Sequence, residues 1–361
     1  MNYKQRLIVL MLFLRIILFP FTPVYRIIVR VRNYLFNRGI FKSEKAGAIV
    51  ISIGNITVGG TGKTPAVNFI AGILKNANKK VGVLSRGYGR SSKGYKLISD
   101  GEEIKSTVSA SGDEIFLTAL ECKVPAAVCE RRVEGAIRFL NDVKLEIIVL
   151  DDAFQHRWIN RDLDILVFDQ NFLSKSGGMD QNLLPVGLMR EPFKSIERAD
   201  AVIINRKFSD ITFLPLPLKP YFEGRKIFNA YYKVAGFYDL RNNQLYNLCD
   251  FKGQKSLVVS GIAAPKSFLN ILEANNISVE NQLFFIDHKK YIMKDIQLIR
   301  KKFYATNSHS VITTQKDALK LMEFGKELDD IDIYYLKIEM EMDSREEFEQ
   351  FILKTANSKQ A

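Results

Sequence analysis

The residue pattern with the clearest chemical meaning is a glycine-rich stretch that ends in lysine and threonine. Residues 54–64 read GNITVGGTGKT, after a short apolar run and before a segment of helical periodicity. Glycines let backbone N–H groups turn towards a polyphosphate, a lysine reaches its β and γ oxygens, and a threonine hydroxyl binds Mg²⁺. The stretch predicts a loop that binds Mg-ATP. Its binding residues are Gly59, Gly60, Thr61, Gly62, Lys63 and Thr64, although Thr57 stands where the strict pattern has glycine.

Two acids follow a second apolar run. Residues 146–150 have the composition of a buried strand, and Asp151 and Asp152 come directly after them. An acid at the end of a neighbouring strand commonly holds the metal beside a phosphate-binding loop, directly or through water. We therefore expect both carboxylates to hold Mg²⁺ or to position water. A strand that simply runs into a turn is the alternative for this pattern taken alone.

Two further candidates have a structural interpretation as well as a functional one. Asp113 and Glu114 precede a helical stretch, where acids are favoured as a cap. His288 follows Asp287, and such a pair is more often structural. Its functional interpretation is an imidazole tuned by a carboxylate to accept a hydroxyl proton.

The elements that must position these groups alternate in type. Apolar runs predict strands, and segments of helical periodicity fall between them. Such alternation predicts an α/β fold of the P-loop NTPase type, with a mostly parallel sheet covered by helices on both faces. The expected strands are residues 48–53, 80–85, 146–150, 164–168 and 201–205, and the expected helices are 65–76, 114–121 and 134–141.

Three prolines between residues 214 and 220 predict a domain boundary. Beyond them the alternation restarts, with strands expected at 256–260, 311–314 and 333–338 and helices at 265–274 and 294–303. We therefore expect three parts: an arm at 1–42, a P-loop domain at 43–220, and a smaller C-terminal α/β domain at 221–361 that contributes to the active-site cleft.

The arm is basic and apolar. The chain of 361 residues has a net charge of +12, and its first 42 residues contain eight Lys or Arg and no Asp or Glu. Residues 7–21 are almost wholly apolar but are interrupted by Arg15 and Pro20. This pattern predicts an amphipathic or shallowly inserted helix at an anionic membrane surface, with a single transmembrane anchor as the alternative. No nucleic-acid-binding module is recognisable, and the three cysteines show no disulfide or metal spacing.

Over nearly its whole length the sequence resembles the tetraacyldisaccharide 4'-kinases, the lipid A 4'-kinases of Gram-negative bacteria. The motifs that carry the resemblance are GN at 54–55, VGGTGKTP at 58–65, SRGYG at 85–89, GDE at 112–114, DDAFQHR at 151–157, REP at 190–192, DH at 287–288 and TQKDA at 314–318.

The resemblance implies transfer of the γ-phosphoryl group of ATP to the 4'-hydroxyl of a lipid A disaccharide 1-phosphate, giving lipid IVA. It implies that Asp113 and His288 deprotonate the hydroxyl and that Lys63 stabilises the transferring group. Further roles follow for other motif residues: Thr64 and Glu191 bind Mg²⁺ with support from Asp151 and Asp152, and Arg86, Tyr88 and His156 contact the substrate. The expected location is the cytoplasmic face of the bacterial inner membrane, peripheral or singly anchored, without an obligate protein partner.

The main alternative is a membrane-associated switch or positioning ATPase that has no small-molecule acceptor. Its loops carry a lysine just before the glycine pair, and this chain has Val58 there. Kinases of soluble sugars or nucleosides fit the loop alone, but they do not explain the apolar arm.

Overall fold

The computed structural model of the chain describes residues 13, 15–262, 265–287 and 289–358. The main helices are α2 Phe21–Asn37, α3 Lys63–Asn76, α5 Asp113–Cys122, α6 Arg132–Asp142, α7 Gln170–Ser174, α8 Lys219–Phe222, α9 Pro265–Ala274, α10 Met293–Ala305, α11 Gln315–Leu321 and α12 Arg345–Asn357. The strands are β1 Ile49–Gly54, β2 Val81–Ser85, β3 Lys96–Asp100, β4 Pro125–Val128, β5 Ile147–Asp151, β6 Leu163–Asp169, β7 Ala201–Asn205, β8 Lys226–Asp239, β9 Leu245–Tyr246, β10 Ser256–Ser260, β11 Asn281–Phe284, β12 Ser310–Thr314 and β13 Ile333–Met342.

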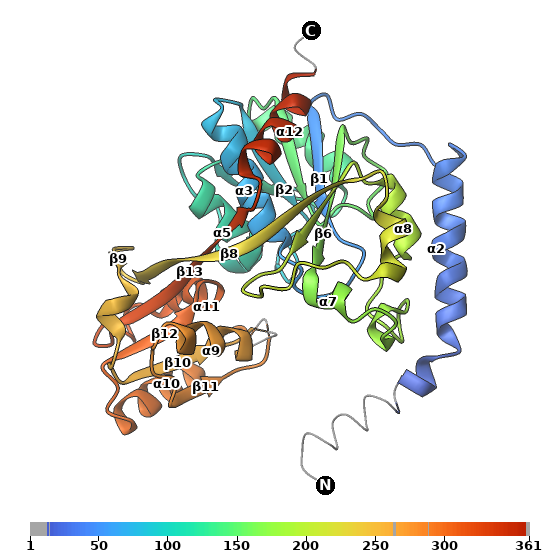
Figure 1. Cartoon of the computed structure of the whole chain (residues 1–361). Coiled ribbons are helices and arrows are strands. Elements are labelled where there is room, and N and C mark those ends of the chain that lie inside the picture. The colour runs from blue at the N-terminus through green and yellow to red at the C-terminus, as the bar shows by residue number, and fades with distance from the viewer. Residues whose placement is uncertain (1–12, 14, 263–264, 288, 359–361) are drawn as a thin grey trace.

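The described strands form one 13-stranded sheet, in the order β11-β10-β12-β13-β8-β7-β6-β1-β5-β2-β4-β3 with β9 beside β8 (Figure 1). Strands β1, β2, β4, β5, β6 and β7 are parallel to their neighbours in this order, and β3 is the antiparallel edge. Their carboxyl ends therefore share one edge of the sheet. The predicted strands and helices are confirmed, with bounds that shift by at most two residues except at the end of β13, which continues four residues beyond the predicted 338.

Helices cover both faces of this larger part, as predicted. Helices α3, α5 and α12 cover one face, where apolar side chains of β1, β5 and β6 are buried against them. Helix α6 covers β2 and β5 on the other face, and α8 covers β6 and β7 there. Burial on both faces explains why the strands have continuous apolar runs rather than alternating ones.

The C-terminal part repeats the pattern on a smaller scale. Strands β10, β11, β12 and β13 are parallel, with α9 on one face and α10 and α11 on the other. A long strand joins the two parts, because β8 pairs first with β7 and then, antiparallel, with β13. The sheet thus continues past residue 220, and the division into domains there stays a prediction.

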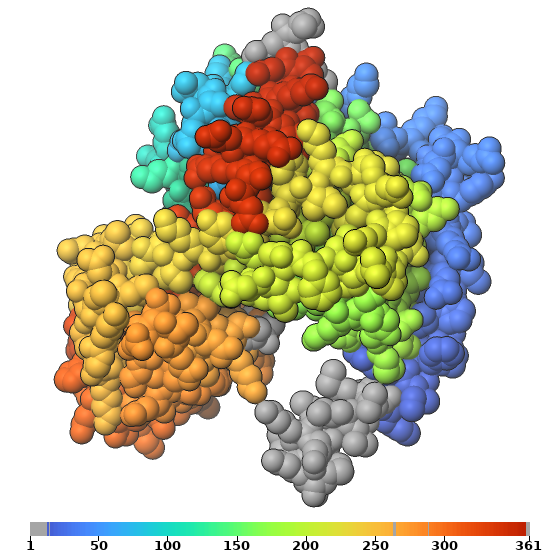
Figure 2. All heavy atoms as spheres, in the orientation of Figure 1, coloured from blue at the N-terminus to red at the C-terminus, as the bar shows by residue number. Residues whose placement is uncertain are grey.

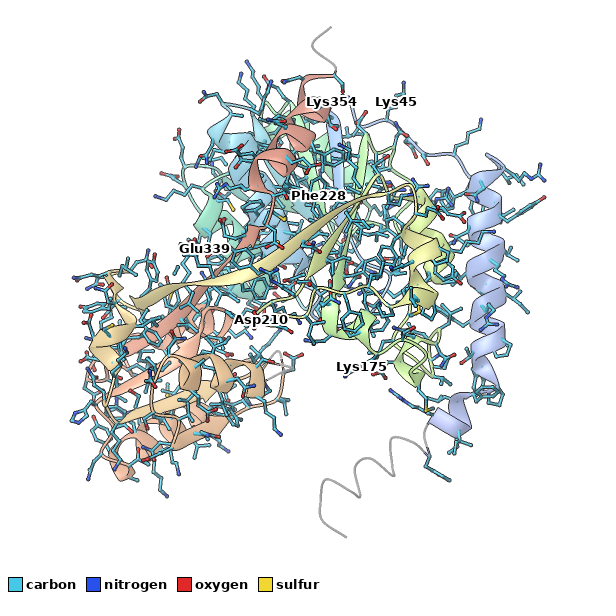
Figure 3. The ribbon with its side chains drawn as sticks, in the orientation of Figure 1. Lys45, Lys175, Asp210, Phe228, Glu339 and Lys354 are labelled. Atoms are coloured by element: carbon cyan, nitrogen blue, oxygen red, sulfur yellow. The ribbon has the colours of Figure 1, made fainter. Side chains whose placement is uncertain are left out.

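The end of the chain returns to the larger part. Side chains at the end of β13 and along α12 belong to the same core as α3 and β1. Phe348 of α12 is fully buried and its ring lies 4.9 Å from that of Phe228 on β8. Figure 3 shows Phe228 within the larger part and Glu339 of β13 where the chain crosses between the parts.

Helix α2 lies along the outside of the larger part and forms one edge of the molecule (Figure 2). Its buried side includes Phe36, whose ring packs edge-on against Trp158 at 4.9 Å. Among the described residues, no helix is long and apolar enough to cross a membrane. Of the predicted apolar segment 7–21, the structure describes residues 13 and 15–21; residues 15–18 are helical, and a turn at 19–20 separates them from α2.

Candidate active site

A large cleft of about 2070 Å³ opens at the carboxyl ends of the parallel strands, between the larger part and the C-terminal part. The loop of residues 58–64 forms one wall, and the ends of β2 and β5 continue it. Residues of α5 lie on this same side, and residues of α9, α11 and β13 line the opposite side. Ligands of open α/β sheets bind at this edge, where the strands end.

The predicted phosphate-binding loop joins β1 to α3, and the helix begins at Lys63. Gly59 and Gly62 have φ angles of 105° and 100°, in a region that L side chains rarely adopt. A Cβ added at Gly62 would also collide with the side-chain amide of Asn205 and the hydroxyl of Tyr232. Glycine is therefore required at position 62 both by the backbone and by its neighbours.

Hydrogen bonds hold the loop from three sides. The side-chain amide of Asn205 donates to the carbonyl of Thr61 at 3.1 Å, and that of Asn55 donates to the Thr61 hydroxyl at 3.1 Å. Val58 N donates to the carbonyl of Leu188 at 2.8 Å. Thr57 is buried and forms an isolated β-bridge with Met189, next to Leu188. This position therefore pairs with a neighbouring backbone segment and does not need glycine.

The ammonium group of Lys63 faces the acids predicted to assist it. Its Nζ lies 3.7 Å from Oδ1 of Asp152, and Asp152 also accepts hydrogen bonds from Nη1 of Arg190 at 3.0 and 3.1 Å. Asp152 has a φ of 50°, so the strained left-handed turn after β5 aims its carboxylate into the cleft. A mobile polyphosphate would compete with Asp152 for the lysine.

Asp151 is a buried carboxylate, and only one of its two oxygens accepts a hydrogen bond in the described structure. Ser85 Oγ donates to its Oδ2 at 3.3 Å, whereas its Oδ1 has no hydrogen-bond partner in the described structure. Burial, followed by the negative charges of Glu114 and Asp152, raises the pKa of Asp151 to about 7. A bound cation would reverse this effect, because it stabilises the ionised form.

These donors fit Mg²⁺ beside a nucleotide. The described residues contain no cluster of three or more His, Cys, Asp or Glu side chains that could hold a metal alone. Mg²⁺ in phosphoryl-transfer sites usually has one or two protein ligands, and phosphate and water supply the rest. Thr64 at the start of α3 and the open Oδ1 of Asp151 match that requirement, with Asp152 alongside.

Glu191 is an exception to the predicted metal group. It is fully buried and is not among the described residues that line the cleft. Arg32 and Asn33 of α2, together with Ser195 and Arg198, donate to its carboxylate at 2.7–2.9 Å. Burial alone would raise the pKa of Glu191, but the two arginines outweigh it and lower the pKa. A carboxylate saturated in this way anchors α2, and its expected role as a Mg²⁺ ligand finds no support in this arrangement.

Asp113 is the first residue of α5, and its Oδ2 lies 3.4 Å from Nζ of Lys320 on α11. His288 lies outside the described residues, so its predicted meeting with Asp113 stays a prediction. Asp287, the residue before it, lines the cleft. Glu114, which the sequence favoured as a simple cap, also lines the cleft and contributes to the charge around Asp151.

The three residues expected to contact the acceptor all line the cleft. Arg86 and Tyr88 are exposed there, in the loop after β2. His156 is half-buried, and burial together with Arg132 and Arg161 lowers its pKa to about 4. Its imidazole is therefore neutral at neutral pH, so it can donate or accept a hydrogen bond without carrying charge.

Sequence analysis missed several site residues. Arg132 is buried under β5 and points towards the carbonyl of Asp151 at 3.5 Å. Arg190 was recognised only as part of a motif, and Asn205 only as the end of a strand. A polar residue at the carboxyl end of a buried strand was the available signal for Asn205, whereas nothing in the sequence distinguishes Arg132 from other helix-starting residues.

Comparison with known proteins decides the family. A family model described as tetraacyldisaccharide-1-P 4'-kinase, LpxK, matches residues 14–357. The chain belongs to this family.

Members of the LpxK family from several bacteria resemble it along most of their length. A tetraacyldisaccharide 4'-kinase of Desulfatibacillum aliphaticivorans is 34% identical, covering 91% of this chain and 89% of the relative. One from Chlorobaculum parvum is also 34% identical and covers 94% of each chain. A crystal structure of LpxK from Aquifex aeolicus, described as an "apo" form in complex with ATP, superposes with a TM-score of 0.79 at 30% identity, covering 95% of this chain and 99% of that one.

The loop geometry predicts a specific effect of Gly62→Ala. The added Cβ cannot coexist with Asn205 and Tyr232, so the loop must shift and its amides leave their positions. We expect ATP affinity, measured by isothermal titration calorimetry, to fall about tenfold or more, since a left-handed backbone costs an L-residue roughly 1–2 kcal/mol. Gly325→Ala is the matched control, because its φ is −58° and its nearest neighbour would lie at 3.5 Å. Equal ATP affinity in the two variants would contradict this account of the loop.

The raised pKa of Asp151 predicts a pH-dependent gain in stability for Asp151→Asn. A folded-state pKa near 7, above the ordinary 3.8, means that the folded protein binds this proton more tightly than the unfolded chain does. The free energy of unfolding contributed by Asp151 therefore falls as the pH rises from about 4 to 7. In EDTA at pH 8 we expect the variant to melt about 2–4 °C or more above wild type.

At pH 5 the same comparison serves as its own control. Folded Asp151 is then protonated, but the carboxyl of the unfolded chain, with its ordinary pKa of 3.8, is still ionised, so the difference in melting temperature should be clearly smaller than at pH 8 without vanishing. A difference of the same size at both pH values would show that ionisation of this carboxylate is not the cause.

Proposed function

We propose that this chain transfers the γ-phosphoryl group of ATP to the 4'-hydroxyl of a tetraacylated disaccharide 1-phosphate. As a member of the LpxK family it is a kinase, and the crystal structure that it resembles was described in complex with ATP. The observation that supports this most directly is Lys63 at the start of α3, facing Asp152 and Asp151 inside one cleft.

The reaction needs positioning and charge neutralisation more than covalent participation by the protein. The amides of residues 59–64 and the Lys63 ammonium hold the β and γ phosphates, and they oppose the charge that develops as the bond between Pγ and the bridging oxygen breaks. Thr64 and the two aspartates would hold Mg²⁺, which would supply further neutralising charge. Asp113, with His288, accepts the proton of the 4'-hydroxyl as its oxygen bonds to Pγ, and ADP leaves.

Helix α2 supports a location at a lipid surface. Val24, Ile27, Ile28 and Val31 follow the i, i+3, i+4, i+7 spacing of one helix face, yet each is at least 50% exposed. An apolar stripe that no other described element covers, flanked by Arg26 and Arg30, fits the interface of an anionic membrane. Because ATP is cytosolic and the acceptor is a lipid, the cytoplasmic face of the inner membrane meets both requirements.

An enzyme assay tests the reaction directly. Detergent-dispersed disaccharide 1-phosphate with γ-labelled ATP should yield a labelled glycolipid. We expect Lys63→Ala to lower kcat at least about 100-fold, as expected for loss of a charge that stabilises the transition state. Asp113→Ala should lower it about 100- to 10,000-fold with ATP binding retained, as expected for loss of a general base.

Lys326→Ala, at an exposed site remote from the loop, is the control and should keep wild-type turnover. ATP hydrolysis that is indifferent to the acceptor, with no labelled lipid, would instead favour the switch ATPase. Wild-type turnover in both site variants would overturn the assignment of residues.

Cosedimentation with phosphatidylglycerol vesicles tests the surface. The triple variant Ile27→Ser, Ile28→Ser and Val31→Ser should bind at least about tenfold more weakly, since burying one such side chain contributes roughly 1.5 kcal/mol or more. The control triple Leu245→Ser, Met293→Ser and Leu298→Ser removes similarly exposed apolar groups from the C-terminal part. Equal loss of binding in both triples would contradict a specific role for α2.

A further inference from the structure

Helix α11 reaches across the cleft to α5 with three polar side chains. Lys320 Nζ lies 3.4 Å from Oδ2 of Asp113, and Lys316 Nζ donates to Oε1 of Glu114 at 2.5 Å. Gln315 donates to the carboxylate of Glu121, the last residue but one of α5. These contacts connect the C-terminal part to the helix that begins with the proposed base.

The opposite side of α11 is fixed within the C-terminal part. Asp317 is fully buried, and its carboxylate accepts hydrogen bonds from Gly261 N at 2.9 Å, the Thr314 hydroxyl at 2.7 Å and the Tyr291 hydroxyl at 3.2 Å. Thr314 in turn caps the helix by accepting from Asp317 N. Because Tyr291 ends the segment that carries Asp287, one buried carboxylate ties both α11 and that segment to the end of β10.

The ammonium groups of α11 lie among acids from both sides of the cleft. Burial alone would lower the pKa of Lys316, but the negative charges of Glu114, Asp113 and Asp287 outweigh it and raise the pKa. Lys316 therefore lies close to α5 and to the 285–291 segment together. Lys320 and Asp113 are each about nine-tenths buried in their side chains, at 12% and 9% exposed, so solvent screens their attraction little.

We propose that Lys320 is a positioning residue for the phosphoryl transfer: it fixes the carboxylate of Asp113 in the orientation from which that group accepts the hydroxyl proton. The inference rests on the proposed function, in which Asp113 is the base. Helix α11 supplies the rigid support. Asp317 anchors it within the C-terminal part, and Lys316 and Gln315 hold α5 beside it through their hydrogen bonds to Glu114 and Glu121. If the carboxylate could rotate away from the acceptor hydroxyl, kcat would fall while the affinity for the nucleotide stayed the same.

A double-mutant cycle in the full-length protein tests this. We expect Lys320→Met to lower kcat about tenfold or more while KM for ATP stays within about twofold. If Lys320 acts through Asp113, the same substitution in an Asp113→Ala background should change the residual kcat less than about twofold. Lys320→Arg, which keeps a cation at this place, should recover part of the rate, and Lys326→Met should match wild type.

Every other outcome contradicts either the positioning role of Lys320 or the proposed function on which it rests. An equal factor in both backgrounds, or wild-type kcat in Lys320→Met, would overturn the positioning role. A rise in KM for ATP in Lys320→Met with kcat unchanged would assign Lys320 to nucleotide binding instead, against the proposal. Wild-type turnover in Asp113→Ala alone would remove the base from the proposed function, and the role of Lys320 with it. Loss of folding in Lys320→Met, seen by thermal melting, leaves Lys320→Arg to decide: no recovery of rate in a folded Arg variant contradicts the proposal.

Discussion

The parallel register of β1, β5, β6 and β7 is the constraint on which the site depends. Parallel strands bring their carboxyl ends to one edge, so a loop after β1, two acids after β5 and an asparagine at the end of β7 become neighbours although they are far apart in sequence. Ile53 pairs with Asp151, so the first acid lies level with the last residue but one of β1, just before the loop. A slip of one residue in this register would turn Asp151 to the other face of the sheet.

At the same edge of the sheet, a buried carboxylate is not fully compensated by its neighbours. Asp151 is buried with one oxygen unsatisfied, and Lys63 and Arg190 both pair with Asp152. A buried carboxylate oxygen without a partner is unfavourable for folding, and under the proposed function a metal with a polyphosphate would compensate it. Local conflict of this kind is expected where function, rather than packing, selects the residues.

The features that could be predicted from the sequence are those determined by residues adjacent in the chain. The loop of residues 59–64 was predictable because glycine, lysine and threonine act through neighbouring backbone, and the strands were predictable because they are short apolar runs buried on both faces. Glu191 and Arg132 were not, since their roles depend on partners more than 18 residues away in sequence: Glu191 meets Arg32 and Asn33 only after α2 docks. The proline-rich stretch at 214–220 predicts a break in regular structure, but residues 216–218 form a 3-10 helix that runs into α8, and a local signal cannot reveal that β8 then extends the same sheet into the next part.

The return of α12 to the core of the larger part has a consequence for biosynthesis. Phe348, Ile352 and Ala356 are made only after the whole C-terminal part, yet they complete the apolar layer over α3 and β1, which precede that part in the chain. The nucleotide-binding half therefore cannot complete its core until the C-terminal part has been synthesised. Helix α2, with its exposed apolar face, is synthesised before both parts and so is present while this core is still incomplete.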